Sequence, residues 1–451
     1  QAAFMPPAML LYRFFCDFSM PVGKQPKKRS SSACFSSCVA GNLGLYWLCR
    51  KNRWAGVLPA CQKNEVTAMI RVAIIGTGNI ANAHVRAYLK FPERCRIVAL
   101  VDIVPEKAQA MKEKYGLDAQ VYDDHQQILS REDIDLADVC TPPFAHASIA
   151  INCLRSGKNV VCEKPMAASL AECDAMLRAR DESGKKLSII AQNRFRQPIS
   201  NLKALLDSGL AGRVLSARIQ SDWWRGHCYY DLWWRGTWEK EGGGCTLNHA
   251  VHHIDMLCWM MGLPQRVTSV LANVAHDNAE VEDLSLSILQ YPGALVQLTA
   301  SVVHHGEEQE LVFQCEKAKL AAPFSCYASV SQPNGFPERN TALEAEIAAY
   351  AAALPPVRWE GHDGQLENVL SALENDTLPA IGGEDGRRTI ELITAIYESG
   401  ATSKAVELPL LPSDPFYTVE GMMARVPHFY QKTTAAASLN GEITLGSNYR
   451  K

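Results

Sequence analysis

Hydrophobic and polar positions follow two different periods along residues 69–192. Short runs rich in β-branched residues predict buried strands, because a strand covered on both faces is apolar throughout. These runs lie at residues 70–75, 96–101, 136–140, 159–162 and 187–191. Segments with helical spacing follow them, at residues 82–91, 105–115, 146–156 and 170–183. Strands that alternate with helices predict an α/β fold with a parallel, doubly wound sheet.

The pattern changes in residues 193–411, where several strand-like segments show period-two alternation. They lie at residues 214–221, 266–275, 284–291, 294–304 and 309–316. Helices are expected at residues 247–261, 342–354, 364–375 and 384–400, and a last strand at 405–408. We therefore expect a second domain at 193–411, followed by a tail at 412–451 that shows no recognisable chemistry.

The first 68 residues differ from the rest in pattern and in charge. They contain nine Lys or Arg residues against two acidic residues, and no regular hydrophobic period. A secretory signal needs a basic start, an apolar run and a small-residue cleavage site, and the stretch from Met5 to Met20 fits this order poorly. We expect a leader outside the fold, with a basic targeting arm at residues 24–29 as the alternative.

The composition excludes several classes of protein. Hydrophobic residues make up 47% of the 451 residues, charged residues 21%, and the net charge is −3. This balance gives no attraction to nucleic acid or to an anionic membrane surface, and no run of about eighteen apolar residues predicts a membrane span. The 15 cysteines are scattered without a C-x-x-C pair. Such spacing favours reduced thiols, and we expect a cytoplasmic location.

A glycine-rich turn joins the first predicted strand to the first predicted helix. Its sequence is Gly76-Thr77-Gly78-Asn79-Ile80-Ala81, a G-x-G-x-x-A pattern. Gly76 permits the tight turn, and Gly78 lets the backbone approach a pyrophosphate, which would lie at the helix N-terminus. The strand before it and the helix after it supply the required context, so the turn predicts a Rossmann dinucleotide-binding domain at residues 69–192.

Asp102 ends the second predicted strand. A carboxylate at this point accepts hydrogen bonds from the adenosine ribose and repels a 2′-phosphate, which favours NAD over NADP. No arginine follows it directly, because Ile103 and Val104 come next. The alternative is that Asp102 caps the helix at 105–115.

Two further strand ends carry residues expected to contact the cofactor. Because the carboxyl ends of parallel strands meet at one edge of a sheet, ligands bind beyond them. The expected contacts are Thr141, Pro142, Pro143, His146, Glu163 and Lys164, in addition to Gly76, Thr77, Gly78, Asn79, Ile80 and Asp102.

Together with Glu163-Lys164-Pro165, the segment GGGCTLNHAVHHID at residues 242–255 resembles the family of glucose–fructose oxidoreductase, inositol dehydrogenase and the rhizopine-catabolism protein MocA. The similarity runs from about residue 69 to beyond residue 408. It implies that the second domain is a substrate-binding α/β domain built on an open, mostly antiparallel sheet. It also implies a homodimer or homotetramer formed by sheet faces, and a reaction without metal.

The resemblance assigns the chemistry to Lys164 and His252. In family members the corresponding lysine and histidine meet at the nicotinamide. Lys164 would polarise the substrate oxygen and join the proton relay, and His252 would exchange the proton near its ordinary pKa of about 6.5. Pro165 would hold the peptide that aims Lys164. Taken without the resemblance, Lys164 would be a surface lysine and His252 a helix-capping histidine.

Asn248 departs from many relatives, which have aspartate at this position. Because an amide cannot stabilise an imidazolium as an anion does, His252 is expected to keep a nearly unperturbed pKa. Asn248 is then a candidate to hydrogen-bond a substrate hydroxyl. His249 and His253 are spaced as zinc ligands can be, but a third ligand with clear spacing is missing, so no metal is expected.

Residues 222–241 contain five of the nine tryptophans, interleaved with arginines. Aromatic faces stack on pyranose rings, and arginines bind hydroxyls or carboxylates, so Trp234 and Arg235 are candidate substrate contacts. A packed aromatic loop or a subunit contact is the alternative. The full set of expected substrate contacts is Lys164, Asn193, Trp234, Arg235, Asn248 and His252.

These residues favour an NAD-dependent oxidoreductase. It would transfer a hydride between nicotinamide and a secondary hydroxyl carbon of a sugar, glycoside or cyclitol, with C3 of a pyranoside as one possible position. The first alternative is a redox-neutral, NAD-dependent glycosidase. The second is a dinucleotide-sensing regulator without activity, and the presence of both Lys164 and His252 argues against it.

Overall fold

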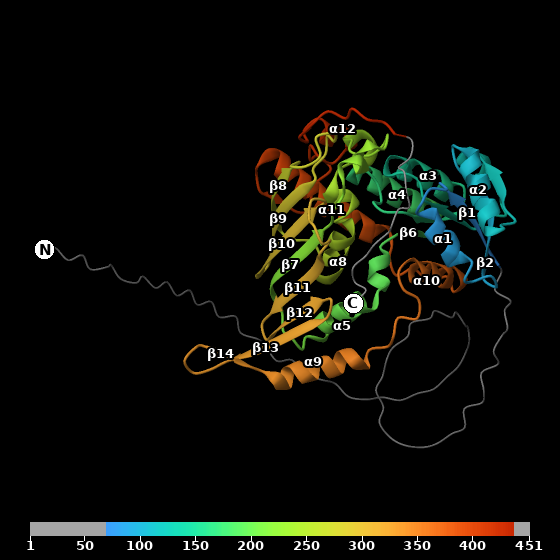
Figure 1. The fold of residues 1–451 in the computed structure, drawn as a ribbon. Coiled ribbons are helices and arrows are strands. Elements are labelled where there is room, and N and C mark those ends of the chain that lie inside the picture. Colours follow the sequence, from blue (N-terminus) through green and yellow to red (C-terminus); the bar gives the residue numbers. More distant parts are fainter. Residues whose placement is uncertain (1–68, 437–451) are drawn as a thin grey trace, which may run out of the picture. The chain divides into compact units, whose positions relative to one another are not determined.

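The computed structural model describes residues 69–436. The prediction of a leader at residues 1–68 lies outside the described residues. The described chain forms two β-sheets, one of six strands and one of nine. Figure 1 shows the second sheet as a row of long strands with helices α8 and α11 along it.

The six-stranded sheet is parallel and has the order β3-β2-β1-β4-β5-β6. This is the strand order of a dinucleotide-binding Rossmann fold, and it confirms the predicted doubly wound sheet. The strands are β1 (Ile70–Ile75), β2 (Cys95–Val101), β3 (Gln120–Tyr122), β4 (Leu136–Val139), β5 (Asn159–Cys162) and β6 (Leu187–Ile189). Sequence reasoning missed β3, because its three residues are exposed or half-buried and carry no apolar run.

Helices α1 (Ala81–Tyr88), α2 (Pro105–Tyr115), α3 (His146–Arg155) and α4 (Leu170–Ser183) connect these strands. Helix α1 ends three residues before the predicted end at residue 91. The chain after Tyr88 turns at once, and the amide groups of Arg94 and Cys95 both bond to the Phe91 carbonyl at the start of β2.

The nine-stranded sheet has the order β14-β13-β12-β11-β7-β10-β9-β8-β15. Strands β7 and β10 pair in parallel, and the other neighbouring strands are antiparallel. This confirms the mostly antiparallel second sheet. The strands are β7 (Val214–Asp222), β8 (Arg266–Ala272), β9 (Leu284–Tyr291), β10 (Ala294–Ser301), β11 (Gln309–Cys315), β12 (Ala318–Ala322), β13 (Ser325–Ser331), β14 (Pro337–Arg339) and β15 (Val406–Glu407).

The prediction of a single helix at residues 247–261 is wrong in one respect. The structure has a short helix α7 (Cys245–Asn248), a break at His249 and Ala250, and then helix α8 (Val251–Met261). The amide groups of His249 and Ala250 both bond to the Cys245 carbonyl, which closes the first helix. The break places His252 in the first turn of α8.

Helices from the end of the chain return to the six-stranded sheet. They are α10 (His362–Glu374) and α11 (Gly383–Thr402), whereas α9 (Thr341–Ala353) contacts β13 of the second sheet and α5 (Gln197–Ser208). Helix α10 packs against α1, where Arg94 forms ion pairs with Glu367 and Glu374. Helix α11 contacts α4, α8 and β8, so it holds the two sheets together.

No helix within residues 69–436 is long and apolar enough to cross a membrane. The cytoplasmic location stays a prediction.

Candidate active site

The glycine turn has the backbone geometry that a phosphate-binding loop needs. Gly76 has a φ of +90°, and a Cβ atom there would lie 2.8 Å from the backbone of Cys140. Gly78 has open space instead, because no heavy atom of the described residues lies within 4 Å of the position of a Cβ. Helix α1 begins directly after the turn, and no side chain caps its N-terminus. The turn therefore fits the pyrophosphate of a dinucleotide, which would meet free backbone N–H groups.

Asp102 is bonded to the glycine turn rather than to helix α2. Its Oδ2 accepts hydrogen bonds from the backbone N–H of Thr77 at 2.8 Å and from the Thr77 hydroxyl at 2.9 Å. Its Oδ1 accepts from the N–H of Val104, which is itself the N-cap of α2. The helix-cap alternative is therefore wrong. The half-buried carboxylate joins β2 to the turn at the edge where a ribose would lie, and its contact with ribose stays a prediction.

His146 joins the ends of two strands. Its buried ring lies 2.8 Å (Nε2) from the carbonyl oxygen of Thr141, after β4, and 2.7 Å (Nδ1) from that of Pro165, after β5. Burial lowers the pKa of His146. The structure thus shows His146 positioning both loops, and its direct contact with a cofactor stays a prediction. The Thr141 hydroxyl has no protein partner among the described residues and is available to a ligand.

Lys164 and His252 line the same cavity, together with apolar side chains of β6 and α11. The Lys164 ammonium donates a hydrogen bond of 3.3 Å to the backbone carbonyl of Asn248. The Lys164–Pro165 peptide bond is cis. The structure therefore brings together the lysine that follows β5 and the motif that spans α7 and α8, although the two lie far apart in sequence.

The electrostatics of this pair differ from the expectation. Burial lowers the pKa of Lys164, and Arg235 lowers it further, while Glu163 opposes them. Burial and the charge of Lys164 hold the pKa of His252 well below its ordinary value. The expectation of an unperturbed His252 is therefore wrong, because it ignored desolvation and the neighbouring ammonium.

The Asn248 amide faces its own loop in this structure. Its Nδ2 donates to the carbonyl oxygens of Gly243 at 3.0 Å and Gly244 at 3.4 Å. The backbone carbonyl of Asn248, and not its side chain, accepts from Lys164. A hydrogen bond from Asn248 to a substrate hydroxyl stays a prediction.

The glycine triplet before α7 makes room for two buried side chains that sequence reasoning missed. A Cβ at Gly243 would lie 2.1 Å from the Tyr397 hydroxyl, and one at Gly244 would lie 1.9 Å from the Glu282 carbonyl. The Glu282 carboxylate accepts from Gly244 N at 3.0 Å, Thr246 N at 2.9 Å and the Tyr397 hydroxyl at 3.0 Å. Glu282 thus holds the loop that leads to Asn248. No local sequence signal pairs residue 282 with this loop.

Asn193 and Arg194 lie at the start of the second domain, and both are buried. The Asn193 side chain accepts a 3.0 Å hydrogen bond from Arg196. Arg194 binds the Asp255 carboxylate through two hydrogen bonds, of 2.8 and 2.7 Å, and reaches Asp385 at 3.1 Å. Arg194 therefore ties α8 to α11, because Asp255 lies in α8, three residues after His252, and Asp385 lies in α11. The substrate contact of Asn193 stays a prediction.

The aromatic segment holds Arg235 close to Lys164. The Arg235 guanidinium lies 4.2 Å from the ring centres of both Tyr229 and Trp234. One of its nitrogens donates 2.8 Å to the buried Glu241, whose pKa burial raises to about 7. Trp234 and Arg235 are half-buried, and the Arg235 Nε has no protein partner among the described residues. The segment is a packed layer of aromatic side chains around Arg235. The substrate contacts of Trp234 and Arg235 stay a prediction.

The tail binds along this aromatic segment. Trp238 Nε1 donates to the Pro427 carbonyl at 3.1 Å. The Trp233 N–H donates to the Ala436 carbonyl at 3.0 Å, and the Ala436 N–H donates to Asp231 at 2.8 Å. Residues 427–436, which carried no readable chemistry in the sequence, therefore support the loop of the candidate substrate residues.

Two groups of side chains in the described part of the chain are close enough to hold an ion, and both contain His84. One is His84, Glu163 and His362, and the other is His84, Asp138 and Cys140. Neither group includes His249 or His253, which the sequence offered as a metal pair. The pKa of His253 is lowered by burial to about 3.

A parallel sheet with a glycine turn, and a lysine and a histidine meeting at its carboxyl edge, defines the class of dinucleotide-binding oxidoreductases. Residues 70–191 match the oxidoreductase family with an NAD-binding Rossmann fold, and residues 199–321 match the GFO/IDH/MocA C-terminal domain. The chain belongs to the GFO/IDH/MocA family, and its N-terminal domain is an NAD-binding domain.

Several relatives of known name are similar to parts of the chain. It is 34% identical over 212 residues to the 2,7-anhydro-N-acetylneuraminate hydratase of Mediterraneibacter gnavus, which covers 47% of this chain and 54% of the relative. It is 26% identical over 359 residues to the D-glucoside 3-dehydrogenase of Escherichia coli, 75% of this chain and 97% of the relative. The chain thus spans only about half the length of some curated relatives that it matches.

A solved structure supports the same fold. The WlbA dehydrogenase from Bordetella pertussis, in complex with NADH and UDP-GlcNAcA, is 28% identical and superimposes with a TM-score of 0.65. The match covers 76% of this chain and 99% of that one.

Proposed function

We propose that this protein is an NAD-dependent oxidoreductase that transfers a hydride between nicotinamide and a secondary hydroxyl carbon of a sugar, glycoside or cyclitol. The observation that carries the proposal is the meeting of Lys164 and His252 at the carboxyl edge of the Rossmann sheet, with Lys164 Nζ 3.3 Å from the Asn248 carbonyl. Relatives named D-glucoside 3-dehydrogenase and inositol 2-dehydrogenase act, by name, on such hydroxyls.

The residues of the glycine turn and Asp102 would hold NAD, which supplies the hydride acceptor. The chain's own groups must then take the hydroxyl proton. His252 is a weak base because its pKa lies well below the ordinary value. Lys164 keeps the greater basicity, and its lowered pKa lets it lose a proton more readily than an exposed lysine does. Lys164 is therefore the proposed proton acceptor, and neutral His252 would orient the substrate hydroxyl.

The substrate would lie between this pair and the aromatic segment. Trp234 offers an apolar face for a pyranose ring, and Arg235 offers a buried N–H donor that has no acceptor within residues 69–436. A donor of this kind suits a sugar hydroxyl or a sugar carboxylate.

One observation favours a second candidate. A relative at 34% identity is named a hydratase and not a dehydrogenase. A redox-neutral reaction on a glycoside, with NAD retained, is therefore the alternative. It would consume substrate without net formation of NADH.

A panel of inositols, free sugars, sugar acids and glycosides, each with NAD and with NADP, tests the proposal. NADH absorbance reports net oxidation, and product analysis reports a redox-neutral reaction. Lys164→Ala should lower kcat roughly 100-fold or more, as expected for a lost acid–base group. The assignment fails if this variant equals the wild type on every active substrate.

We also propose a homodimer or homotetramer assembled through the second sheet. Helices α8 and α11 pack on this sheet, while alternate apolar side chains of its strands are exposed. They include Val270, Leu286, Ile288 and Leu295. A contiguous apolar surface of this kind favours association with a second copy.

A further inference from the structure

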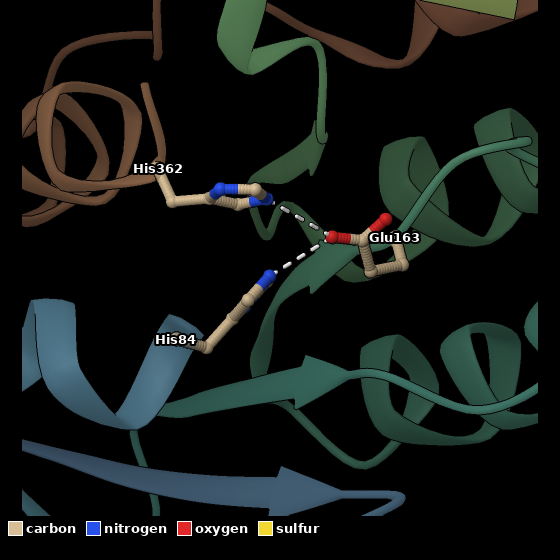
Figure 2. A group of neighbouring side chains, drawn as sticks. All are labelled: His84, Glu163 and His362. Carbon is tan, nitrogen blue, oxygen red and sulfur yellow. Dashed lines mark hydrogen bonds and ion pairs between the residues drawn. The ribbon is translucent and has the colours of Figure 1, made fainter. Parts of the chain in front are cut away.

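A buried cluster of ionisable side chains lies next to Lys164 and consists of His84, Asp138, Glu163 and His362. The His84 ring, in α1, is placed between two carboxylates. Its Nδ1 lies 2.8 Å from Asp138 Oδ2, and its Nε2 lies 2.9 Å from Glu163 Oε1. His84 and Asp138 have no exposed surface. Figure 2 shows His84 and His362 approaching the same Glu163 oxygen from two sides, with His362 Nε2 at 3.5 Å.

The geometry determines the charge of this cluster. Because each His84 nitrogen faces a carboxylate oxygen, the geometry favours a proton on both nitrogens, which makes the ring an imidazolium. Burial lowers the pKa of His84, but Asp138 and Cys140 together outweigh burial and leave the pKa well above its ordinary value. Burial likewise raises the pKa of Glu163, but His362 and His84 hold it well below its usual range. The cluster therefore holds Glu163 as a fixed anion.

This anion acts directly on the proposed proton acceptor. The second Glu163 oxygen, Oε2, accepts a 3.0 Å hydrogen bond from the backbone N–H of Lys164. The carboxylate thus fixes the backbone from which the Lys164 side chain reaches Asn248. The Glu163 charge also favours the ammonium form of Lys164, against burial and Arg235.

The cluster also connects three separate parts of the fold. His84 lies in the helix that begins at the glycine turn, Asp138 lies in β4, and His362 is the first residue of α10. The contact between His84 and Glu163 therefore links helix α1, which begins at the glycine turn, to the residue before Lys164.

We propose that the His84–Glu163 pair is a positioning device, which holds Lys164 in register with the glycine turn and keeps an anion beside it. This inference rests on the proposed function, because Lys164 must take part in hydride transfer for its position to matter. In this role neither His84 nor Glu163 needs to touch the substrate or the cofactor, so the position proposed for Glu163 differs from the direct cofactor contact expected from the sequence.

The test compares Glu163→Gln and His84→Asn with a matched control, His125→Asn. His125 is another histidine of the Rossmann domain, and its ring contacts Asp124 and Asn152. Glu163→Gln keeps the shape of the side chain and removes its charge, while the other charges near Lys164, those of Arg235 and Glu241, stay in place.

The first measurement needs no activity. Competitive acetylation of the protein without cofactor, followed by mass spectrometry across pH, gives the protonation midpoint of Lys164. Glu163→Gln should move this midpoint to lower pH, because an anion that favours the ammonium is lost. His125→Asn should leave it unchanged. An unchanged midpoint in Glu163→Gln overturns the electrostatic part of the proposal.

The second measurement is kinetic. Both cluster variants should lower kcat roughly 10- to 100-fold, as loss of an orienting partner does, with substrate KM and NAD affinity within about threefold of the wild type. The positioning role is overturned if kcat stays within about twofold. It is also overturned if NAD affinity or the melting temperature falls in parallel with kcat, because the cluster would then serve binding or folding alone.

Two further results complete the test. If His84→Asn does not fold, Glu163→Gln decides the question alone. Stoichiometric zinc in the purified protein that disappears in His84→Asn would also overturn the proposal, because these side chains would then be ligands. If the wild type and Lys164→Ala are equally inactive toward every substrate, the proposed function fails, while the acetylation experiment still tests the link between Glu163 and Lys164.

Discussion

At the scale of single residues, the identity of a side chain matters less here than what surrounds it. Sequence motifs identify Lys164 and His252, but their surroundings assign the roles. Burial beside an ammonium makes His252 a poor base, whereas Lys164 retains an adjacent anion in Glu163. A motif cannot report this division, because it depends on groups that lie elsewhere in the chain.

Asn248→Asp tests the assignment of Lys164 as base. A carboxylate at this position would lie near Lys164 and His252 and raise the pKa of both. Because a base must be unprotonated to accept the hydroxyl proton, kcat/KM for oxidation rises with pH through the Lys164 pKa. Asn248→Asp should therefore shift the rise of kcat/KM to higher pH, whereas Glu163→Gln should shift it to lower pH. Asn248→Ala is the control, and a pH profile identical in wild type and Asn248→Asp would contradict the assignment.

Alanine substitutions at the two glycines of the turn should have different effects on stability and on NAD affinity. Gly76→Ala places a methyl group 2.8 Å from backbone at a φ of +90°, and should cost about 2 kcal/mol or more of folding free energy. The methyl group of Gly78→Ala meets no atom of residues 69–436, so stability should change by less than about 1 kcal/mol. NAD affinity should still fall about tenfold, since the methyl group occupies the space of the phosphate. Urea unfolding and calorimetric titration with NAD measure both, and equal NAD affinity in Gly78→Ala and wild type would argue against this cofactor position.

At the scale of elements, the hydrophobic pattern predicts whether a segment is a helix or a strand better than it predicts where the element begins and ends. Five of the six Rossmann strands follow from their apolar runs, and the second sheet follows from its alternation. Sequence reasoning missed β3 and β12 to β14, and it joined α7 to α8. Those strands are short or half-exposed, and the break at His249 comes with two amide groups, those of His249 and Ala250, sharing the Cys245 carbonyl, which no apolar pattern predicts.

The residues that contact the motif residues from distant parts of the chain could not be predicted either. His84, Glu282 and Arg194 each position a motif residue from a distant part of the chain. Their sequence surroundings resemble an ordinary helix face, strand edge and loop. Only the fold brings them to the site, and for this reason the motif residues could be predicted while the residues that hold them could not.

The link between α8 and α11 should be costly to break. Arg194→Met leaves Asp255 buried without its cation, which should reduce stability by about 3–5 kcal/mol. The control is Arg213→Met, which removes an exposed ion pair with Glu316 and should leave stability nearly unchanged. Urea denaturation gives both values. Similar losses in the two variants would show that the Arg194 pair is not a tie between the helices.

At the scale of the whole molecule, the exposed face of the second sheet predicts association. Leu286→Glu combined with Leu295→Glu places charges on that face and should convert the oligomer to a monomer. Leu378→Glu changes an equally apolar residue that is exposed elsewhere, and should leave the mass unchanged. Light scattering after size-exclusion chromatography measures the mass. A wild-type monomer, or an oligomer that survives both sheet substitutions, would contradict this interface.

The central claim is that Lys164 and His252 serve a hydride transfer from a sugar carbon to NAD. Its most direct test uses a substrate from the panel that carries deuterium at the oxidised carbon, in a single turnover with NAD. Mass spectrometry of the dinucleotide should show one deuterium transferred by the wild type, and at least roughly 100-fold slower transfer by Lys164→Ala. Product formation without deuterium in the dinucleotide, or equal transfer by Lys164→Ala, would contradict the account.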